Sequence, residues 1–318
     1  MTTNEVVTAV QSKWISGFWR RIVAIFVDFL ILGLLGFILG LLLSNIFIQM
    51  GGWGRLIGFI IALSYFAAMN SKLFNGQTIG KKILKIKVVN SSNEFIPLGK
   101  SILRSLVLLI PVFLNGAQFT EAITGSFLIY PISFIIFGGF LASIYLYIFN
   151  RTTRQSLHDI AVGTYVANAN ASIQATEKIW GKHLLLTALI FLVAALAPIL
   201  TPKLIEDKSY KNLSIAQSAV MKNTNVSSAS VFSGWTTFNS STNKDSKTTT
   251  YIRIQALLKT KDIEDKVFAK KLATSAMENI PEAAKVDTIQ IILVSGYDIG
   301  IWSQSVNYTH VFKPLELL

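Results

Sequence analysis

The sequence predicts a membrane all-α helical bundle of about five spans, followed by a small α+β domain with antiparallel strands. Only 14% of the 318 residues are charged and the mean hydropathy is +0.51, whereas soluble domains carry about 25% charged residues. Long apolar runs fill the chain before Pro202, and polar residues dominate after it. We therefore expect a membrane domain over residues 1–168, a linker with a fifth helix over 169–204, and a separate domain over 205–318.

Five apolar runs approach the length of about 20 residues that a helix needs to cross a bilayer. The first is longer than the apolar part of a signal peptide and contains Asp28, so we expect it to stay in the protein. The third is the weakest, because it carries Arg104 and Pro111. The runs cover about residues 22–43, 55–70, 102–119, 126–149 and 184–202.

Basic residues predict the orientation of these spans, because Lys and Arg of short loops stay on the cytoplasmic side. Residues 1–21, 71–104 and 150–183 together hold 14 Lys and Arg, and the loops between them hold almost none. All three segments lie on one side if residues 102–119 form a span. The amino terminus is then cytoplasmic and the C-terminal domain extracytoplasmic. If residues 102–119 lay flat in the interface instead, two arginines would face outside, against the rule.

After Pro202 the pattern is typical of a domain with two helices and two hairpins. We expect Asp262 to cap the second helix and its Lys266, Lys270 and Lys271 to face solvent. A domain of about 110 residues can bury its own core. The expected elements are a helix over 208–221, strands over 226–238 and 251–259 with a loop over 239–249, a helix with the apolar stripe Ile263, Val267, Phe268, Leu272 and Ala276, and strands over 286–294 and 299–311 around a turn at 295–298.

The first charged motif opens the first span, where Arg20 and Arg21 precede Asp28. Arg21 and Asp28 are seven residues apart, so they share one helix face at about 10 Å along the axis. A carboxylate at that depth costs about 2.5–3.5 kcal/mol unless it finds a partner, and Arg21 is the expected counter-ion. The pair is either an ion or proton site or a fixed polar link between helices.

The second motif, GQTIGKK, lies between the second and third spans. Its glycine spacing and the Lys in place of Ser or Thr exclude a nucleotide-binding loop. Lysines interleaved with Ile and Val from Lys81 to Lys87 favour a segment at the membrane interface, on anionic lipid headgroups. The residues of interest are Gly76, Thr78, Gly80, Lys81 and Lys82.

The third motif, RQSLHDIAVGT, begins at Arg154, directly after the fourth span. It contains His158 and Asp159. An unperturbed histidine titrates near neutral pH. His158 is therefore either a proton shuttle or a hydrogen-bonding residue at the interface.

These three motifs, in this order, resemble the RDD family of membrane proteins over about residues 14–168. The resemblance maps the family's arginine onto Arg21 and its two aspartates onto Asp28 and Asp159. It implies a polar site of these residues in a bacterial plasma membrane, and some members look like cation/proton antiporters. The supporting residues are Arg20, Gly76, Thr78, Gly80, Lys81, Lys82, Arg154 and His158.

The sequence is compatible with two functions of different classes. In the first, Asp28 takes up and releases a monovalent cation, a proton or a small solute, Arg21 tunes its charge, and Asp159 with His158 forms the cytoplasmic mouth. A homo-oligomer would help to build such a pathway, because the chain has no evident internal repeat. In the second, the three charges form a structural cluster in a non-transporting scaffold or anchor, and the outer domain binds an envelope protein or a ligand.

Other classes of function have no support in the sequence. The chain has no cysteine and only three histidines, which are far apart, so we expect no metal site. We also expect no enzymatic activity, no cofactor and no nucleic-acid partner. The pairs Gly36/Gly40 and Gly54/Gly58 have the spacing that lets helices approach closely. We expect them to pack helices within one chain rather than in a dimer.

Overall fold

The computed structural model describes residues 13–117, 119, 123, 125–175, 177–200, 208–239 and 246–317. The expected boundaries at Pro202 and residue 205 lie outside the described residues, as do residues 240–245 of the expected loop. The chain divides into two compact units. Unit 1 comprises Met1–Gly33 and Phe59–Pro198, and unit 2 comprises Leu34–Gly58 and Ile199–Leu318.

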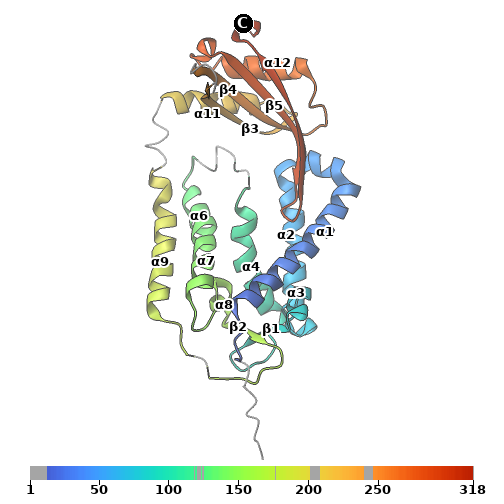
Figure 1. Ribbon diagram of the computed structural model, residues 1–318, viewed down its shortest axis with the longest axis vertical. Coiled ribbons are helices and arrows are strands. Elements are labelled where there is room, and N and C mark those ends of the chain that lie inside the picture. The colour runs from blue at the N-terminus through green and yellow to red at the C-terminus, as the bar shows by residue number, and fades with distance from the viewer. Residues whose placement is uncertain are drawn as a thin grey trace, which may run out of the picture. The chain divides into compact units, whose positions relative to one another are not determined.

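Unit 1 is a set of helices with a small sheet at one end (Figure 1). It holds the first part of α1 (Phe18–Met50), most of α2 (Gly54–Met69), and the later helices. Strand β1 (Ile86–Asn90) pairs antiparallel with β2 (Thr164–Asn168). The short helices α3 (Ile79–Ile83) and α8 (Leu157–Val162) lie beside this sheet. The other helices are α4 (Leu98–Leu114), α6 (Ile129–Ser133), α7 (Gly139–Phe149) and α9 (Gly181–Leu196), with a π-helical turn η3 (Phe134–Gly138) between α6 and α7.

Three described segments are long and apolar enough to cross a membrane, namely Phe18–Met69, Ile129–Phe149 and Gly181–Ile199. Large apolar side chains lie exposed along them, such as Leu42 (74%) and Leu185 (70%), as expected where helices face lipid. The expected five separate spans are not supported. The first two expected spans form one apolar helical segment, in which α1 and α2 are joined by the 3-10 turn η1 (Gly51–Trp53).

Helix α4, the third expected span, has 17 residues, fewer than the roughly 20 needed for a crossing. It also begins earlier than expected, at Leu98, and ends at Leu114 rather than near residue 119. Its Arg104 is only 4% exposed, so this charge lies inside the protein and not in a basic loop.

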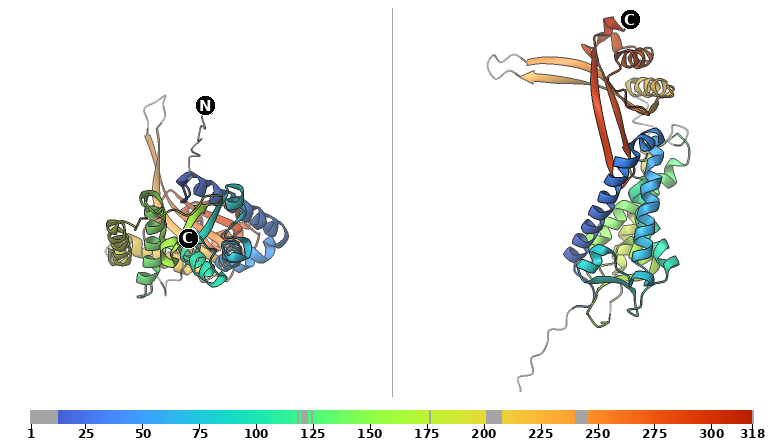
Figure 2. Two further views of the ribbon diagram at one scale, coloured as in Figure 1. Left: turned by 90° about the horizontal axis from the view of Figure 1, so that it is seen from below. Right: turned by 90° about the vertical axis from the view of Figure 1, so that its right-hand side faces the viewer.

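The C-terminal domain in unit 2 has the expected order of helix, hairpin, helix and hairpin. The strand order is β3-β4-β5-β6, and both hairpins are antiparallel, but β4 and β5 run parallel. The sheet is therefore mixed, because a helix connects these two strands as a crossover. Both helices cover the same face of the sheet (Figure 2). The elements are α11 (Lys208–Met221), β3 (Val226–Asn239), β4 (Ser246–Leu258), α12 (Lys266–Met277), β5 (Thr288–Asp298) and β6 (Ser303–Phe312).

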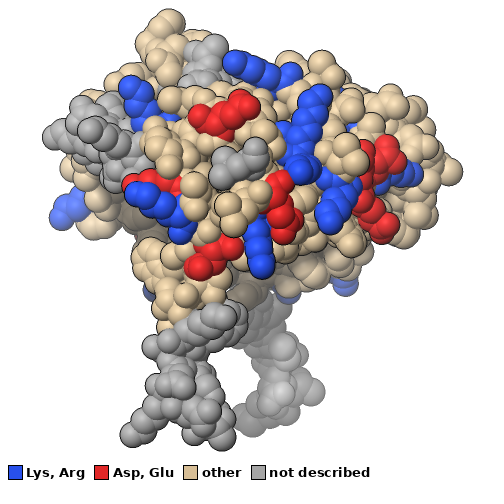
Figure 3. All heavy atoms as spheres, turned by 90° about the horizontal axis from the view of Figure 1, so that it is seen from above, with Lys and Arg blue, Asp and Glu red and all other residues tan. Residues whose placement is uncertain are grey.

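Several details of this domain were predicted wrongly. Residues 246–249, expected in a loop, belong to β4, which begins at Ser246 rather than at 251. Asp265, not Asp262, caps α12, because its side chain accepts from the Phe268 backbone N–H at 2.9 Å. Val267 is 82% exposed, since it lies one position away from the buried stripe. Strand β5 continues to Asp298, so the turn falls at residues 299–302. The lysines of α12 are exposed as expected, and Figure 3 shows basic and acidic side chains interspersed on the face drawn there.

In unit 2 the turn between β5 and β6 packs on the adjoining ends of α1 and α2. A Cβ at Gly40 would overlap the hydroxyl of Tyr297, and one at Gly58 would overlap the carbonyl oxygen of Ile299. Gly36 and Gly54 face the same turn. The expectation that these four glycines pack helices together is therefore wrong, because the atoms that approach them belong to the end of a β-hairpin, side-chain atoms at Gly36 and Gly40 and backbone atoms at Gly54 and Gly58.

Candidate functional site: a buried cluster of arginine and aspartate

Asp159 is the centre of a buried charge cluster in unit 1. Its Oδ2 accepts from Arg21 Nη2 at 2.8 Å, and its Oδ1 accepts from Arg104 Nη2 at 2.7 Å and Nε at 3.0 Å. The Thr164 hydroxyl donates to Oδ1 at 3.1 Å. Asp159 also completes a capping box with Ser156 at the start of α8. This carboxylate therefore joins α1, α4, α8 and β2 through hydrogen bonds.

Arg21 is fixed by two further contacts. Its Nη1 donates to the carbonyl oxygen of Arg154, and its guanidinium lies 5.0 Å from the ring centroid of Tyr147. Arg154 has a φ of 52°, a left-handed conformation uncommon for a residue with a Cβ. Arg20 lies apart from this cluster and donates to the Asn168 side chain at 3.2 Å.

Asp28 is fully buried and has different partners from those expected. Its Oδ2 accepts from the Thr78 hydroxyl at 2.6 Å, and its Oδ1 accepts from the Tyr65 hydroxyl at 2.7 Å and the Gly80 N–H at 2.8 Å. The expected Arg21–Asp28 pair is therefore wrong. The carboxylate is held instead at the N-terminus of α3, where free backbone N–H groups favour a negative charge, and Arg21 is bound to Asp159.

The second motif forms the structure that receives Asp28. Thr78 is the N-cap of α3, and a Cβ at Gly80 would overlap the Ala24 carbonyl oxygen of α1. Gly76 has a φ of 64°, and a Cβ there would overlap the Val88 carbonyl oxygen. Both glycines thus allow backbone contacts that a larger residue would prevent. Lys81 is half-buried and Lys82 is exposed.

Two residues of this site were missed by sequence reasoning. Arg104 was counted with the basic loop, and Tyr65 was not considered. Both left a signal, because a charge or a hydroxyl inside an apolar run needs a buried partner. Two buried acids with only one assigned arginine also left room for a second cation.

The charges shift the pKa values of the residues around Asp159. Burial would raise the pKa of Asp159, but the positive charge of Arg104, with His158 and Arg21, outweighs it and holds the pKa below its usual range. Burial lowers the pKa of His158 to about 3, and Arg104 and Arg21 act in the same direction. His158 is therefore neutral at pH 7, which does not suit a proton shuttle. Burial, with the charge of Arg104, lowers the pKa of Lys81 to about 7.

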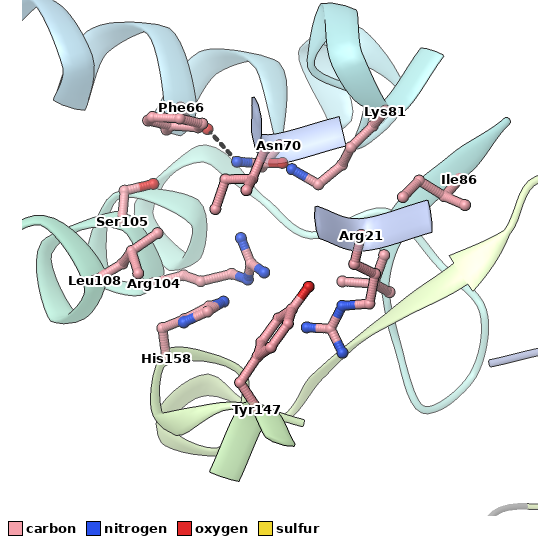
Figure 4. A pocket seen from close by; sticks show the side chains of 12 residues that line it. Arg21, Phe66, Asn70, Lys81, Ile86, Arg104, Ser105, Leu108, Tyr147 and His158 are labelled. Carbon is pink, nitrogen blue, oxygen red and sulfur yellow. Dashed lines mark hydrogen bonds between the residues drawn. The ribbon is translucent and has the colours of Figure 1, made fainter. Parts of the chain in front are cut away.

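A cavity of about 40 Å³ lies beside this cluster (Figure 4). Three cationic side chains from different elements point towards it, namely Arg21, Lys81 and Arg104. Neither Asp28 nor any other Asp or Glu of the described residues lines it. In the described part of the chain, no group of three or more His, Asp or Glu side chains is arranged to hold a metal ion.

Apolar helices with a charge cluster buried at their ends define an integral membrane protein with an internal polar site. Residues 15–163, just under half of the chain, match the model of the RDD family. The family resemblance of the three motifs is thereby confirmed. Neither the curated proteins nor the solved structures contain a match to this chain.

Proposed function

We propose that this protein is a membrane anchor of the RDD type, in which the buried charges hold the fold together and the C-terminal domain is the working part. One observation carries the proposal. The carboxylates of Asp28 and Asp159 are fully buried, and every oxygen of both accepts a hydrogen bond from the protein. A transported ion would have to displace these donors, at a cost of about 1–3 kcal/mol for each group left unsatisfied.

The proposal includes an arrangement in a bacterial plasma membrane. The amino terminus lies in the cytoplasm and the C-terminal domain outside. The loop charges support this orientation. Reporters fused after residues 120 and 318 should both be found outside, and a cytoplasmic signal at 318 would refute the placement of the domain.

The C-terminal domain has a surface suited to an envelope protein or a ligand. Its β3–β4 hairpin extends well beyond the rest of the sheet (Figure 2). On β3, Trp235 is 73% and Phe232 is 55% exposed. Exposed aromatic residues of this kind carry much of the binding energy of protein interfaces. They support a binding role for this hairpin.

Transport of a cation, a proton or a small solute is the second candidate. The observation that favours it is the cavity beside Arg21 and Arg104, because a permease needs internal polar space. The two functions differ in ion flux through purified protein in proteoliposomes. The anchor predicts background flux for the wild type and for Asp28→Asn alike. Flux that is coupled to cations or pH, and that the folded Asp28→Asn variant lacks, would refute the anchor.

A further inference from the structure

Lys81 is a half-buried ammonium group without a matching carboxylate. Its Nζ has one long contact, to the Thr78 hydroxyl at 3.4 Å. Within the described ranges, no Asp or Glu lies at ion-pair distance from it. Asp28 accepts hydrogen bonds from three other donors, and Asp159 forms ion pairs with two guanidinium groups. The ammonium group therefore has donors to spare and faces the cavity shown in Figure 4.

The cavity has further polar atoms that lack a partner. The Ser105 hydroxyl, the Asn70 Oδ1 and the His158 Nδ1 are all buried, and none has a hydrogen bond. The three residues line the same space as Lys81. Each unsatisfied group costs free energy unless something in the cavity bonds to it. The space of about 40 Å³ has room for about three waters, or for one small ion with its water.

We propose that this cavity binds a small free anion of halide size, with the Lys81 ammonium and the Ser105 hydroxyl as its donors. The charge balance favours an anion over a cation. Three cationic side chains line the cavity, and the two carboxylates near them, Asp28 and Asp159, leave one positive charge unmatched. Waters that hydrate the anion can donate to Asn70 Oδ1 and His158 Nδ1. The apolar walls formed by Ile25, Phe66 and Leu108 leave no room for a larger headgroup.

Binding of the anion should weaken as the pH rises. The groups facing Lys81 are Arg21 and Asp28 from α1, Arg104 from α4, Tyr147 from α7, and His158 and Asp159 from α8. The pKa of Lys81 is about 7, so its ammonium group loses its proton as the pH rises from about 6 to 8.5. An anion prefers the charged ammonium, so its affinity should fall as the pH rises through this range.

The test measures thermal unfolding of the full chain in detergent, in sodium bromide against sodium gluconate at equal ionic strength. A ligand that binds the folded state raises the unfolding temperature in a saturable way. We expect a saturable bromide effect for the wild type at pH 6, an affinity at least about tenfold weaker in Lys81→Met, and no change in the exposed neighbour variant Lys82→Met. In crystals, the anomalous signal of bromide should lie in the cavity.

Two results would overturn the site. One is a wild type that responds equally to bromide and gluconate, and the other is an equal bromide response in Lys81→Met and Lys82→Met. Ser105→Ala tests the same cavity if Lys81→Met does not fold, and it should also weaken the bromide effect. None of these measurements requires flux, so the anion site and the anchor function succeed or fail separately.

Discussion

The cluster around Asp159 makes a quantitative prediction for Asp159→Asn. The substitution keeps the shape of the side chain but leaves two buried guanidinium groups without a counter-ion. Removing one partner of a buried ion pair costs about 3–5 kcal/mol. We therefore expect the free energy of unfolding to fall by about 3–5 kcal/mol, a large part of the roughly 5–15 kcal/mol of a typical domain.

A matched control is available in a partly exposed Arg–Asp pair, Arg55 and Asp298. Asp298 accepts from Arg55 at 2.5 Å, but its side chain is 45% exposed. Exposed pairs contribute about 0–1 kcal/mol, so Asp298→Asn should cost far less. Denaturant unfolding in mild detergent, followed by circular dichroism, gives both values. Equal losses in the two variants would refute the claim that burial makes the Asp159 cluster strong.

A double-mutant cycle separates the ion pair from the shape of the side chain. Arg104→Met removes one guanidinium, so Asp159→Asn then leaves a single uncompensated cation. The double variant should be more stable than the sum of the single losses implies, by at least about 1 kcal/mol. Additive losses would mean that Asp159 and Arg104 act independently.

Three further predictions concern other residues of the two units. Because the unfolded chain keeps Lys81 protonated up to about pH 10.5 and the folded chain only to about 7, stability should rise with pH between these values, and Lys81→Met should abolish the rise in denaturant titrations. Thr78→Val removes a donor to Asp28 and the cap of α3, and should cost about 1–3 kcal/mol of unfolding free energy, while Lys82→Met stays within about 0.5 kcal/mol. Gly58→Ala should overlap Ile299, lower the melting temperature and increase protease cleavage of the β5–β6 turn, whereas Gly99→Ala, which meets no neighbour, should do neither.

The sequence predicted elements well where one periodicity dominated. The helix over 208–221 has the same bounds in the structure, and the strand over 226–238 is one residue longer. Errors arose where two signals competed. The turn expected at 295–298 contains Gly296, but Tyr297 is buried against Phe47 of α1 and the strand continues to Asp298. Packing against other parts of the fold decided the position of the turn, and local turn composition did not.

The buried acids show the limit of sequence reasoning at the site. The position of Asp28 deep inside an apolar run is enough to predict that its carboxylate needs hydrogen-bond donors, because this follows from the neighbouring sequence alone. The nearest cation along the helix was Arg21, but the donors come from Tyr65, Thr78 and Gly80, which are 37 to 52 residues further along the chain. Their arrival depends on how α3 folds back onto α1. No spacing within the first motif contains that information.

The packing of the glycine pairs of α1 and α2 also shows that sequence spacing does not identify the contacting segment. Their spacing predicted a strip of helix surface that another helix approaches closely, and the structure shows the close approach but not a helix. A helix is the commonest occupant of such a strip, yet here the strip receives residues 297–302, more than 230 positions beyond the glycines of the α2 pair. Because glycine has no Cβ, any segment of suitable shape can approach the helix at these positions. The spacing of the glycines therefore predicts a close contact, and only the tertiary topology determines which segment makes it.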